Sequence, residues 1–139
     1  MTAKAPGRSQ IMARVHSRNT TPELLVRSVT HQLGYRFRLH RRDLPGTPDL
    51  VFPRLRAVIL VHGCFWHQHR CARGDRRPKT NRAYWLPKLK RNVERDQRAI
   101  RALRRDGWRV LVIWECQTRN HERVAARIDR FLCSAEARL

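Results

Sequence analysis

Hydrophobic positions along the chain follow the two periods that distinguish strands from helices. Short segments in which apolar residues alternate or run continuously are typical of strands, and a continuous run indicates burial on both faces. Four segments have this character and are predicted as strands: 35–39, 49–52, 57–61 and 108–114. The segment 35–39 alternates, whereas the runs at 49–52 and 57–61 are continuous and are expected to be buried on two faces.

Helical spacing of apolar residues predicts three helices. The first begins at Thr20, a hydroxyl cap followed closely by proline and glutamate, and ends at Gly34. The second is long and basic and covers 81–106, and the third covers 121–132. The order helix, three strands, helix, strand, helix predicts an α/β fold with a mixed sheet flanked by helices.

Basic residues greatly outnumber acidic ones. The chain has 31 Lys and Arg against 11 Asp and Glu, which gives a formal net charge of +20. A high-GC genome explains arginine in place of lysine, but it does not explain so large a net excess. This charge attracts polyanions, so nucleic acid is the expected partner, through phosphate contacts, rather than a membrane surface.

The length of 139 residues favours one domain, at 19–139, preceded by a flexible basic arm at 1–18. No segment resembles a signal peptide, and no run of about 18 apolar residues could span a bilayer. We therefore expect a monomeric, cytoplasmic protein that works at the bacterial nucleoid. In that compartment the four cysteines favour metal binding or buried thiols over disulfides.

The densest chemistry lies in the segment 62–71, directly after the predicted strand 57–61. It holds three histidines, two cysteines and two adjacent aromatic residues. A closed structural zinc site would pin this long loop to the sheet, although ordinary buried thiols are the alternative. The candidate zinc ligands are Cys64, His69, Cys71 and the distant Cys116. Spacing alone does not choose between His67 and His69, and Cys133 is expected to be a core thiol.

Asp49 opens a predicted strand directly after Pro48. A carboxylate at the rim of a sheet can hold a hard cation such as Mg²⁺, whereas a simple turn residue beside a proline is the alternative. The functional interpretation is favoured because the next strand delivers His62 nearby, about one hairpin away.

Asp96 lies on the apolar face of the long predicted helix. A carboxylate in such a stripe must be paired, either with a histidine of 62–71, which it would orient and make more basic, or with an arginine in a purely structural pair. These two alternatives stay open. Glu23 borders the apolar face of the first helix and raises the same question. The stripe that contains Asp96 comprises 85, 89, 93, 96, 100 and 103.

Aromatic residues accompany the basic ones. Phe65 and Trp66 lie in a polar loop, and Trp85 begins a helix that carries nine Lys or Arg between Arg82 and Arg105. Exposed aromatic rings between basic side chains suit stacking on bases or wedging between them. For Trp85 a place in the core explains the sequence equally well.

At these residues the chain resembles the very-short-patch (Vsr) repair endonucleases. The similarity runs in order over nearly the whole chain, in the motifs Ser9-x-x-Met12, Thr20-x-x-Glu23, Leu44-Pro-Gly-x-Pro-Asp49, His62-Gly-Cys-Phe-Trp-His67, Trp85, Asn92-Val-Glu-Arg-Asp96, Gly107-Trp-Arg-Val and Trp114-Glu-Cys116. The resemblance implies a restriction-endonuclease-like fold. It also implies nicking of one strand of double-stranded DNA, on the 5′ side of the thymine in a T:G mismatch left by deamination of 5-methylcytosine.

The resemblance also implies roles for particular residues. Asp49 and the main chain of Val61, where several relatives carry threonine, are expected to bind Mg²⁺. His67 is expected to act in proton transfer with Asp96 nearby, and His62 at the scissile phosphate. Structural zinc is assigned to Cys64, His69, Cys71 and Cys116. DNA contacts are assigned to the wedge residues Phe65, Trp66 and Trp85, and to the N-terminal arm, with Met12 and Arg14, which grips DNA together with Glu23.

We therefore predict a Mg²⁺-dependent mismatch-nicking endonuclease with a structural zinc ion, for which mismatch-repair proteins are candidate partners. Two alternatives remain. One is a nuclease of the same fold with broader mismatch specificity or with activity on unmodified duplex. The other is a non-catalytic, zinc-stapled DNA-binding module.

Overall fold

The computed structural model describes residues 20–64, 67, 69, 71 and 82–139. Their elements follow the predicted order, with one short addition after the last strand. The strands are β1 (Arg38–Leu39), β2 (Leu50–Phe52), β3 (Ala57–His62) and β4 (Arg109–Trp114). The helices are α2 (Thr21–Gln32), α3 (Arg82–Arg105), the 3-10 turn η1 (Glu115–Arg119) and α4 (His121–Glu136).

The four strands form one mixed sheet in the order β1-β2-β3-β4. β1 pairs with β2, and β2 with β3, in antiparallel fashion, whereas β3 and β4 are parallel. The register of β3 and β4 places Ala57 opposite Arg109 and His62 opposite Trp114. Because parallel strands end at the same edge of a sheet, the residues that follow His62 and Trp114 are brought together.

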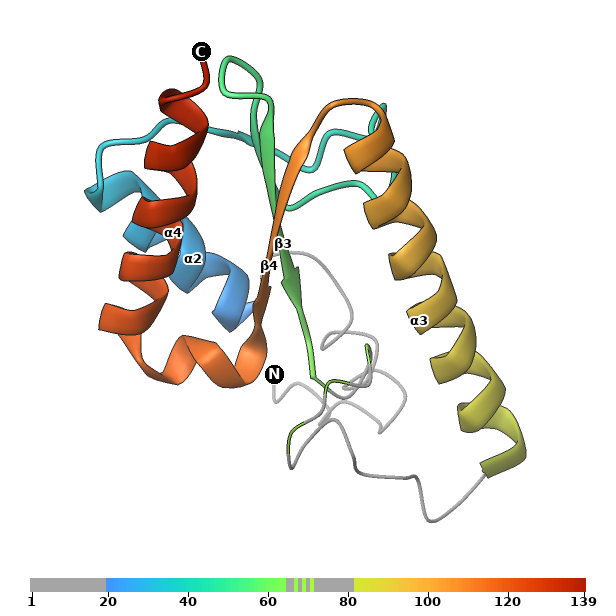
Figure 1. Cartoon of the computed structure of the whole chain (residues 1–139). Coiled ribbons are helices and arrows are strands. Elements are labelled where there is room, and N and C mark those ends of the chain that lie inside the picture. The colour runs from blue at the N-terminus through green and yellow to red at the C-terminus, as the bar shows by residue number, and fades with distance from the viewer. Residues whose placement is uncertain (1–19, 65–66, 68, 70, 72–81) are drawn as a thin grey trace, which may run out of the picture.

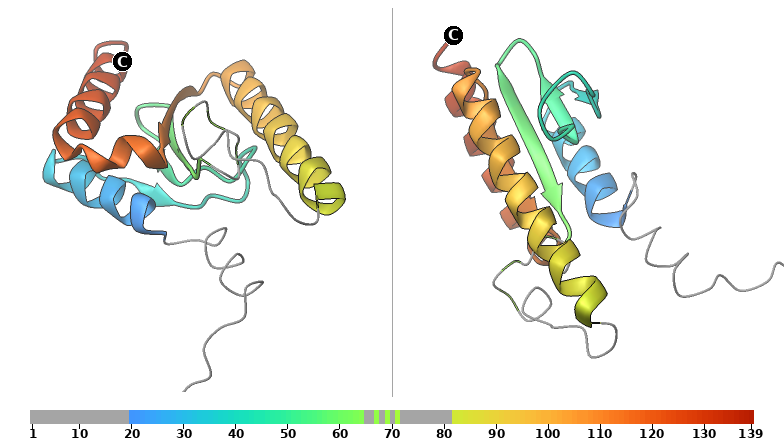
Figure 2. Two further views of the ribbon diagram at one scale, coloured as in Figure 1. Left: turned by 90° about the horizontal axis from the view of Figure 1, so that it is seen from below. Right: turned by 90° about the vertical axis from the view of Figure 1, so that its right-hand side faces the viewer.

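Helices cover both faces of this sheet. α2 and α4 pack together on one side and α3 lies on the other, as Figures 1 and 2 show. The larger core forms against α2 and α4 from alternate strand residues such as Leu50, Ile59 and Ile113. A smaller core on the α3 side contains Val51, Val58 and Leu103. The expected burial of the two continuous runs on both faces is confirmed.

The ends of the elements follow from local chemistry. Thr20 Oγ1 accepts a hydrogen bond from the Glu23 amide at 3.4 Å, which caps α2 and places Glu23 in its first turn. Gly34 and Gly107 follow α2 and α3 with φ values of 95° and 89°, a region that glycine adopts without strain. Both helix ends therefore lie where the glycines predict them.

Three details differ from the prediction. The strand expected at 35–39 is reduced to Arg38–Leu39, the two residues that pair with β2, and α4 continues to Glu136. Cys133 is exposed rather than a core thiol. It lies on the outer side of α4, where its Sγ is 3.3 Å from the Tyr35 hydroxyl. None of the helices in the described part of the chain is long and apolar enough to cross a bilayer.

Candidate active site and metal centre

Side chains capable of acid–base or metal chemistry gather where β3 and β4 end and β2 begins. Within the described ranges they form three groups, each compact enough to hold a metal ion. We name them the cysteine cluster (Cys64, His69, Cys71 and Cys116), the histidine–aspartate cluster (His62, His67 and Asp96) and the carboxylate cluster (Glu23, His40 and Asp49).

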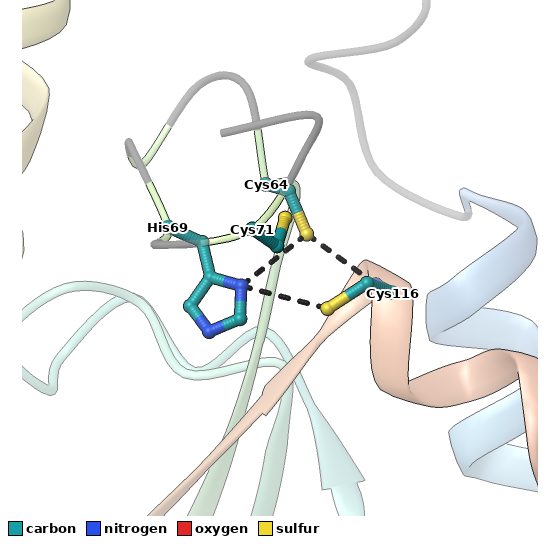
Figure 3. Close-up of side chains that lie close together, drawn as sticks. All are labelled: Cys64, His69, Cys71 and Cys116. Carbon is teal, nitrogen blue, oxygen red and sulfur yellow. Dashed lines mark hydrogen bonds between the residues drawn. The ribbon is translucent and has the colours of Figure 1, made fainter. Parts of the chain in front are cut away.

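The cysteine cluster joins the segment after β3 to the turn after β4, as Figure 3 shows. The Nδ1 atom of His69 lies 3.8 Å from Cys64 Sγ and 3.5 Å from Cys116 Sγ. The Cys116 amide donates a hydrogen bond to Cys64 Sγ at 3.3 Å. Since the strand register places His62 opposite Trp114, Cys64 and Cys116 each lie two residues beyond the paired ends.

This donor set is suited to a metal ion. Three thiols and one imidazole, with their donor atoms within 4.8 Å of one another, match the ligands of a closed structural site. Burial raises the pKa of the Cys64 thiol to about 12, and neighbouring thiols add to the effect. A bound cation would reverse this shift, because it stabilises the thiolate. The histidine that joins the thiols is His69, whereas His67 belongs to another cluster.

The histidine–aspartate cluster faces α3. His67 Nδ1 forms a short hydrogen bond to Asp96 Oδ2, so the partner of Asp96 is a histidine rather than an arginine. The rings of His62 and His67 stack with centroids 4.0 Å apart and planes 5° from parallel. Both rings and Asp96 line a cavity of about 250 Å³ between α3 and β4. The pair thus places an oriented imidazole in an accessible hollow.

His62 is almost completely buried, with 7% of its surface exposed, and its Nδ1 atom has no hydrogen-bond partner among the described residues. Burial, with a smaller contribution from the adjacent His67, lowers the pKa of His62 to about 3, while Asp96 opposes the shift. His62 is therefore neutral near pH 7 and can serve as a hydrogen-bond donor or acceptor without carrying charge.

The carboxylate cluster lies at the start of β2. Asp49 Oδ2 accepts a hydrogen bond from the Val61 amide at 2.6 Å. Glu23, which is 4% exposed, accepts one from Arg27 at 2.6 Å. His40 lies between the two acids, with its Nε2 atom 3.1 Å from Glu23 Oε1 and 3.9 Å from Asp49 Oδ1.

The electrostatics of Asp49 suit a cation. Burial and the hydrogen bond and charge of Glu23 raise the pKa of Asp49 to about 8, while the Val61 amide and the charge of Arg27 act in the opposite direction. Two carboxyl groups so close together cannot both ionise easily unless a positive charge joins them. The site therefore has the donor atoms for a hard divalent ion, and a bound cation would favour the ionised form of Asp49.

The carboxylate and histidine–aspartate clusters meet on neighbouring residues of β3. Asp49 bonds to the Val61 amide, and His67 stacks on the ring of His62. A single rigid strand end thus carries both groups of side chains. Such an arrangement can present a carboxylate-held cation and an imidazole base to a substrate at the rim of the sheet.

The expected DNA-contacting residues are described only in part. Phe65, Trp66, Met12 and Arg14 lie outside the described residues. Trp85 is half-buried near the start of α3, and its assignment to DNA contact stays a prediction.

Two residues that the sequence did not single out contact residues that it did. Tyr84, which is 59% exposed, meets Trp85 edge to face at 5.0 Å, and Lys88 Nζ lies 5.7 Å and 5.5 Å from the two rings. His40 joins the carboxylate cluster, although its sequence neighbours are ordinary polar and basic residues. In the sequence, only the position of Tyr84 in a basic helix could have indicated this residue, and no pattern indicated His40.

The chain as a whole is similar in sequence to known proteins. The family model "DNA mismatch endonuclease Vsr" matches residues 3–73. The chain is 52% identical to a type II nicking enzyme, V.XorIIP of Xanthomonas oryzae pv. oryzae, over 90% of this chain and 91% of the relative. It is 39% identical to the DNA mismatch endonuclease Vsr of Escherichia coli K12, over 94% and 86% of the two chains. A nicking enzyme of Neisseria meningitidis, V.NmeAIP, is 38% identical over 90% and 89%.

Proposed function

The chain belongs to the Vsr family of DNA mismatch endonucleases, and we propose that it nicks one strand of duplex DNA on the 5′ side of the thymine in a T:G mismatch. The observation that carries this proposal is the meeting of a carboxylate cluster and an oriented imidazole at the end of β3. Hydrolysis of a phosphodiester requires a cation on the phosphate oxygens, a water in line and a group that takes its proton.

We assign the cation site to the carboxylate cluster, with Asp49 as the principal ligand. The two neighbouring carboxyl groups and the raised pKa of Asp49 fit a hard cation such as Mg²⁺. When bound, the cation supplies charge neutralisation at the phosphate. The expected second ligand is the main chain of Val61, whose carbonyl oxygen can bind a cation whatever the side chain. The Val61 amide donates a hydrogen bond to Asp49, which keeps this part of the main chain beside the carboxylate.

His67 is assigned to proton transfer. Asp96 holds Nδ1 of its ring, which fixes the orientation of the ring and leaves Nε2 to take a proton from water. Neutral His62, stacked on His67, is assigned to a hydrogen bond with the scissile phosphate. The cysteine cluster is assigned to a structural zinc ion, which would fix the segment that carries His67.

We assign the selection of a T:G mismatch to the low free-energy cost of inserting aromatic rings there, rather than to many contacts with base edges. A T:G wobble stacks less well than a normal pair, so insertion of aromatic rings is cheapest there. Phe65, Trp66 and Trp85 are the proposed wedge, and the basic arm with Met12 and Arg14 is proposed to grip the duplex. Membership in a family of endonucleases disfavours a non-catalytic module, whereas broader mismatch specificity remains the alternative.

A strand-resolved nicking assay tests the catalytic assignment. Zinc-loaded protein with Mg²⁺ should nick only the T strand of a T:G duplex. We expect His67→Ala to slow nicking by about 10²–10⁴-fold, because general-base catalysis is lost. Asp49→Asn should slow it by about 100-fold or more, because the cation loses its main ligand. Both variants should still bind the duplex in an anisotropy assay.

Asp129→Asn is the matched control, since Asp129 is an exposed aspartate on α4, and it should nick at the wild-type rate. Equal nicking of T:G, other mismatches and fully paired duplexes would reject the specificity. A wild type that binds DNA but never cuts it with a divalent cation would support the non-catalytic module instead.

A further inference from the structure

His40 occupies the position in the carboxylate cluster where the two acids face each other. Its ring is largely buried, with 12% of the side chain exposed. One atom, Nε2, is directed at both acids, 3.1 Å from Glu23 Oε1 and 3.9 Å from Asp49 Oδ1. The His40 amide also donates a hydrogen bond to the Asp49 carbonyl at 3.4 Å, so the backbone holds the two residues together.

In each acid, one carboxylate oxygen faces His40 and the other has a different partner. Glu23 Oε2 is the oxygen that pairs with Arg27, and Asp49 Oδ2 is the one that accepts from the Val61 amide. The oxygens that face His40 are therefore Oε1 and Oδ1. Glu23, His40 and Asp49 each offer one donor atom, and these three atoms lie within 4.8 Å of one another, a spacing that one metal ion can bridge.

We propose that His40, through Nε2, is a direct ligand of the cation held by Glu23 and Asp49, and that it shifts the preference of this site toward Mn²⁺ relative to Mg²⁺. This inference rests on the proposed function, because it names a further residue at the same cation site. Imidazole suits transition metals, whereas Mg²⁺ favours oxygen ligands and water. A nitrogen in an otherwise oxygen-rich set therefore changes which cation binds best.

Ligation requires a lone pair on Nε2. In the described structure this atom is within hydrogen-bond distance of Glu23, so it carries the ring proton when it donates to that acid. When the cation binds, that proton moves to Nδ1 or to solvent, and the Nε2 lone pair forms the new bond. No oxidant or other reactant is needed.

Mn²⁺ provides a readout that does not depend on nicking. Protein loaded first with zinc and then titrated with Mn²⁺ should show ¹⁴N modulation in electron spin-echo spectra, the signature of an imidazole ligand. The affinities for Mn²⁺ and Mg²⁺ follow from the free Mn²⁺ signal in direct and competition titrations. His40→Gln should lose the modulation and lower the Mn²⁺ to Mg²⁺ affinity ratio by about tenfold, the scale of a lost metal contact.

Two variants serve as controls for the source of the nitrogen. His31→Gln makes the same change at an exposed position on α2 and should keep the modulation. His67→Gln removes the imidazole of the neighbouring cluster and should keep it as well. If His40→Gln does not fold, His40→Asn replaces it, because His40 has φ 48° and asparagine tolerates left-handed backbone well.

Absence of ¹⁴N modulation in the wild type, or an unchanged affinity ratio in His40→Gln, would overturn the role of His40. Asp49→Asn separates this failure from failure of the proposed function. If Mn²⁺ binding requires Asp49 but shows no nitrogen, the cation site stands and His40 is not a ligand. If Asp49→Asn binds Mn²⁺ like the wild type, the carboxylate cluster is not the cation site and both proposals fall.

Discussion

At the scale of single residues, the candidate site combines groups that titrate in opposite directions. Burial raises the pKa of Asp49 to about 8 and lowers that of His62 to about 3. Both shifts have the same main cause, because burial disfavours the charged form of each side chain. Asp49 accepts a hydrogen bond from the Val61 amide, and His62 is the next residue of β3. The end of this strand therefore holds a protonated acid and a neutral imidazole side by side.

These shifts predict how the stability of the cation-free protein depends on pH. Folded Asp49 binds a proton that the unfolded chain has already released above its model value of 3.8, so stability is lost as pH rises toward about 8. His62 acts oppositely, but only below 6.5, the unfolded value, because the unfolded chain takes up its proton there. The interval from 6.5 to 8 therefore isolates Asp49.

The expected result is a melting temperature that falls from pH 6.5 to pH 8 in wild-type protein without divalent cation. Asp49→Asn should flatten this slope, and added Mg²⁺ should stabilise the wild type more at pH 8 than at pH 6.5. Zinc must be kept bound throughout, and Asp129→Asn provides the control. Identical slopes in Asp49→Asn and the wild type would show that Asp49 is ionised in the folded protein.

At the scale of elements, the cysteine cluster ties two segments that are separated by 52 residues between Cys64 and Cys116. The strands themselves are held by a hydrogen-bonded ladder, whereas the segment beyond β3 is attached through these ligands and through the hydrogen bond of His67 to Asp96. A metal ion in this cluster would therefore stabilise the segment that carries His67 more than it stabilises the sheet.

Removal of zinc should lower the melting temperature and loosen this segment before the sheet unfolds. A shift of about 5 °C or more is expected, since roughly 1–2 kcal/mol has that effect in a domain of this size. Melting with and without a chelator measures it. Cys116→Ser should melt like the chelated wild type, and Cys133→Ser, which changes an exposed thiol on α4, should melt like the untreated wild type. Chelator-independent melting of the wild type would contradict the zinc assignment.

The elements also show how far the sequence predicts this fold. Apolar runs identify β2 and β3 because their residues are buried on both faces, and they identify β4 although most of its residues are only partly buried. Gly34 and Gly107 mark helix ends by conformation alone. β1 is poorly predicted because its length depends on its partner: Tyr35 and Phe37 pack on the core, and only the next two residues pair with β2.

The candidate site is predictable to a similar degree and for similar reasons. Asp96 stands out because a carboxylate interrupts an apolar stripe, and its partner could not be chosen because a histidine and an arginine satisfy it equally well. His67 and His69 are two residues apart, so spacing could not show that one meets Asp96 and the other the thiols. His40 escaped notice because its partner Glu23 is 17 residues away, on a different element.

At the scale of the whole molecule, the net charge is +20, and the candidate site lies at one end of the sheet. α3 begins at this end, as Figure 1 shows, and its exposed side chains include Arg91, Arg95 and Arg98. Arg138 is also exposed but lies near the C-terminus, at the other end of the molecule. We therefore expect DNA phosphates along the middle of α3, beside these arginines.

Binding to a T:G duplex should weaken steeply as salt rises, because phosphate contacts release counterions. Fluorescence anisotropy at several salt concentrations gives the slope of log K against log salt. Arg91→Gln should reduce the slope by about one contact, which is roughly 0.9. Arg138→Gln should leave it unchanged. A flat response in the wild type would contradict phosphate-dominated binding, and an equal loss in both variants would place the duplex elsewhere.

The parallel pairing of β3 with β4 has a consequence for how the molecule matures. These strands are joined through α3, so their ladder closes a long stretch of chain and forms slowly compared with local helices. A slip of one residue would turn the side chains of β4 to the opposite face and carry Cys116 away from Cys64. If the cysteine cluster holds a metal ion, as proposed, only chains with the correct register of β3 and β4 would complete that site, so metal binding would favour the correctly paired sheet.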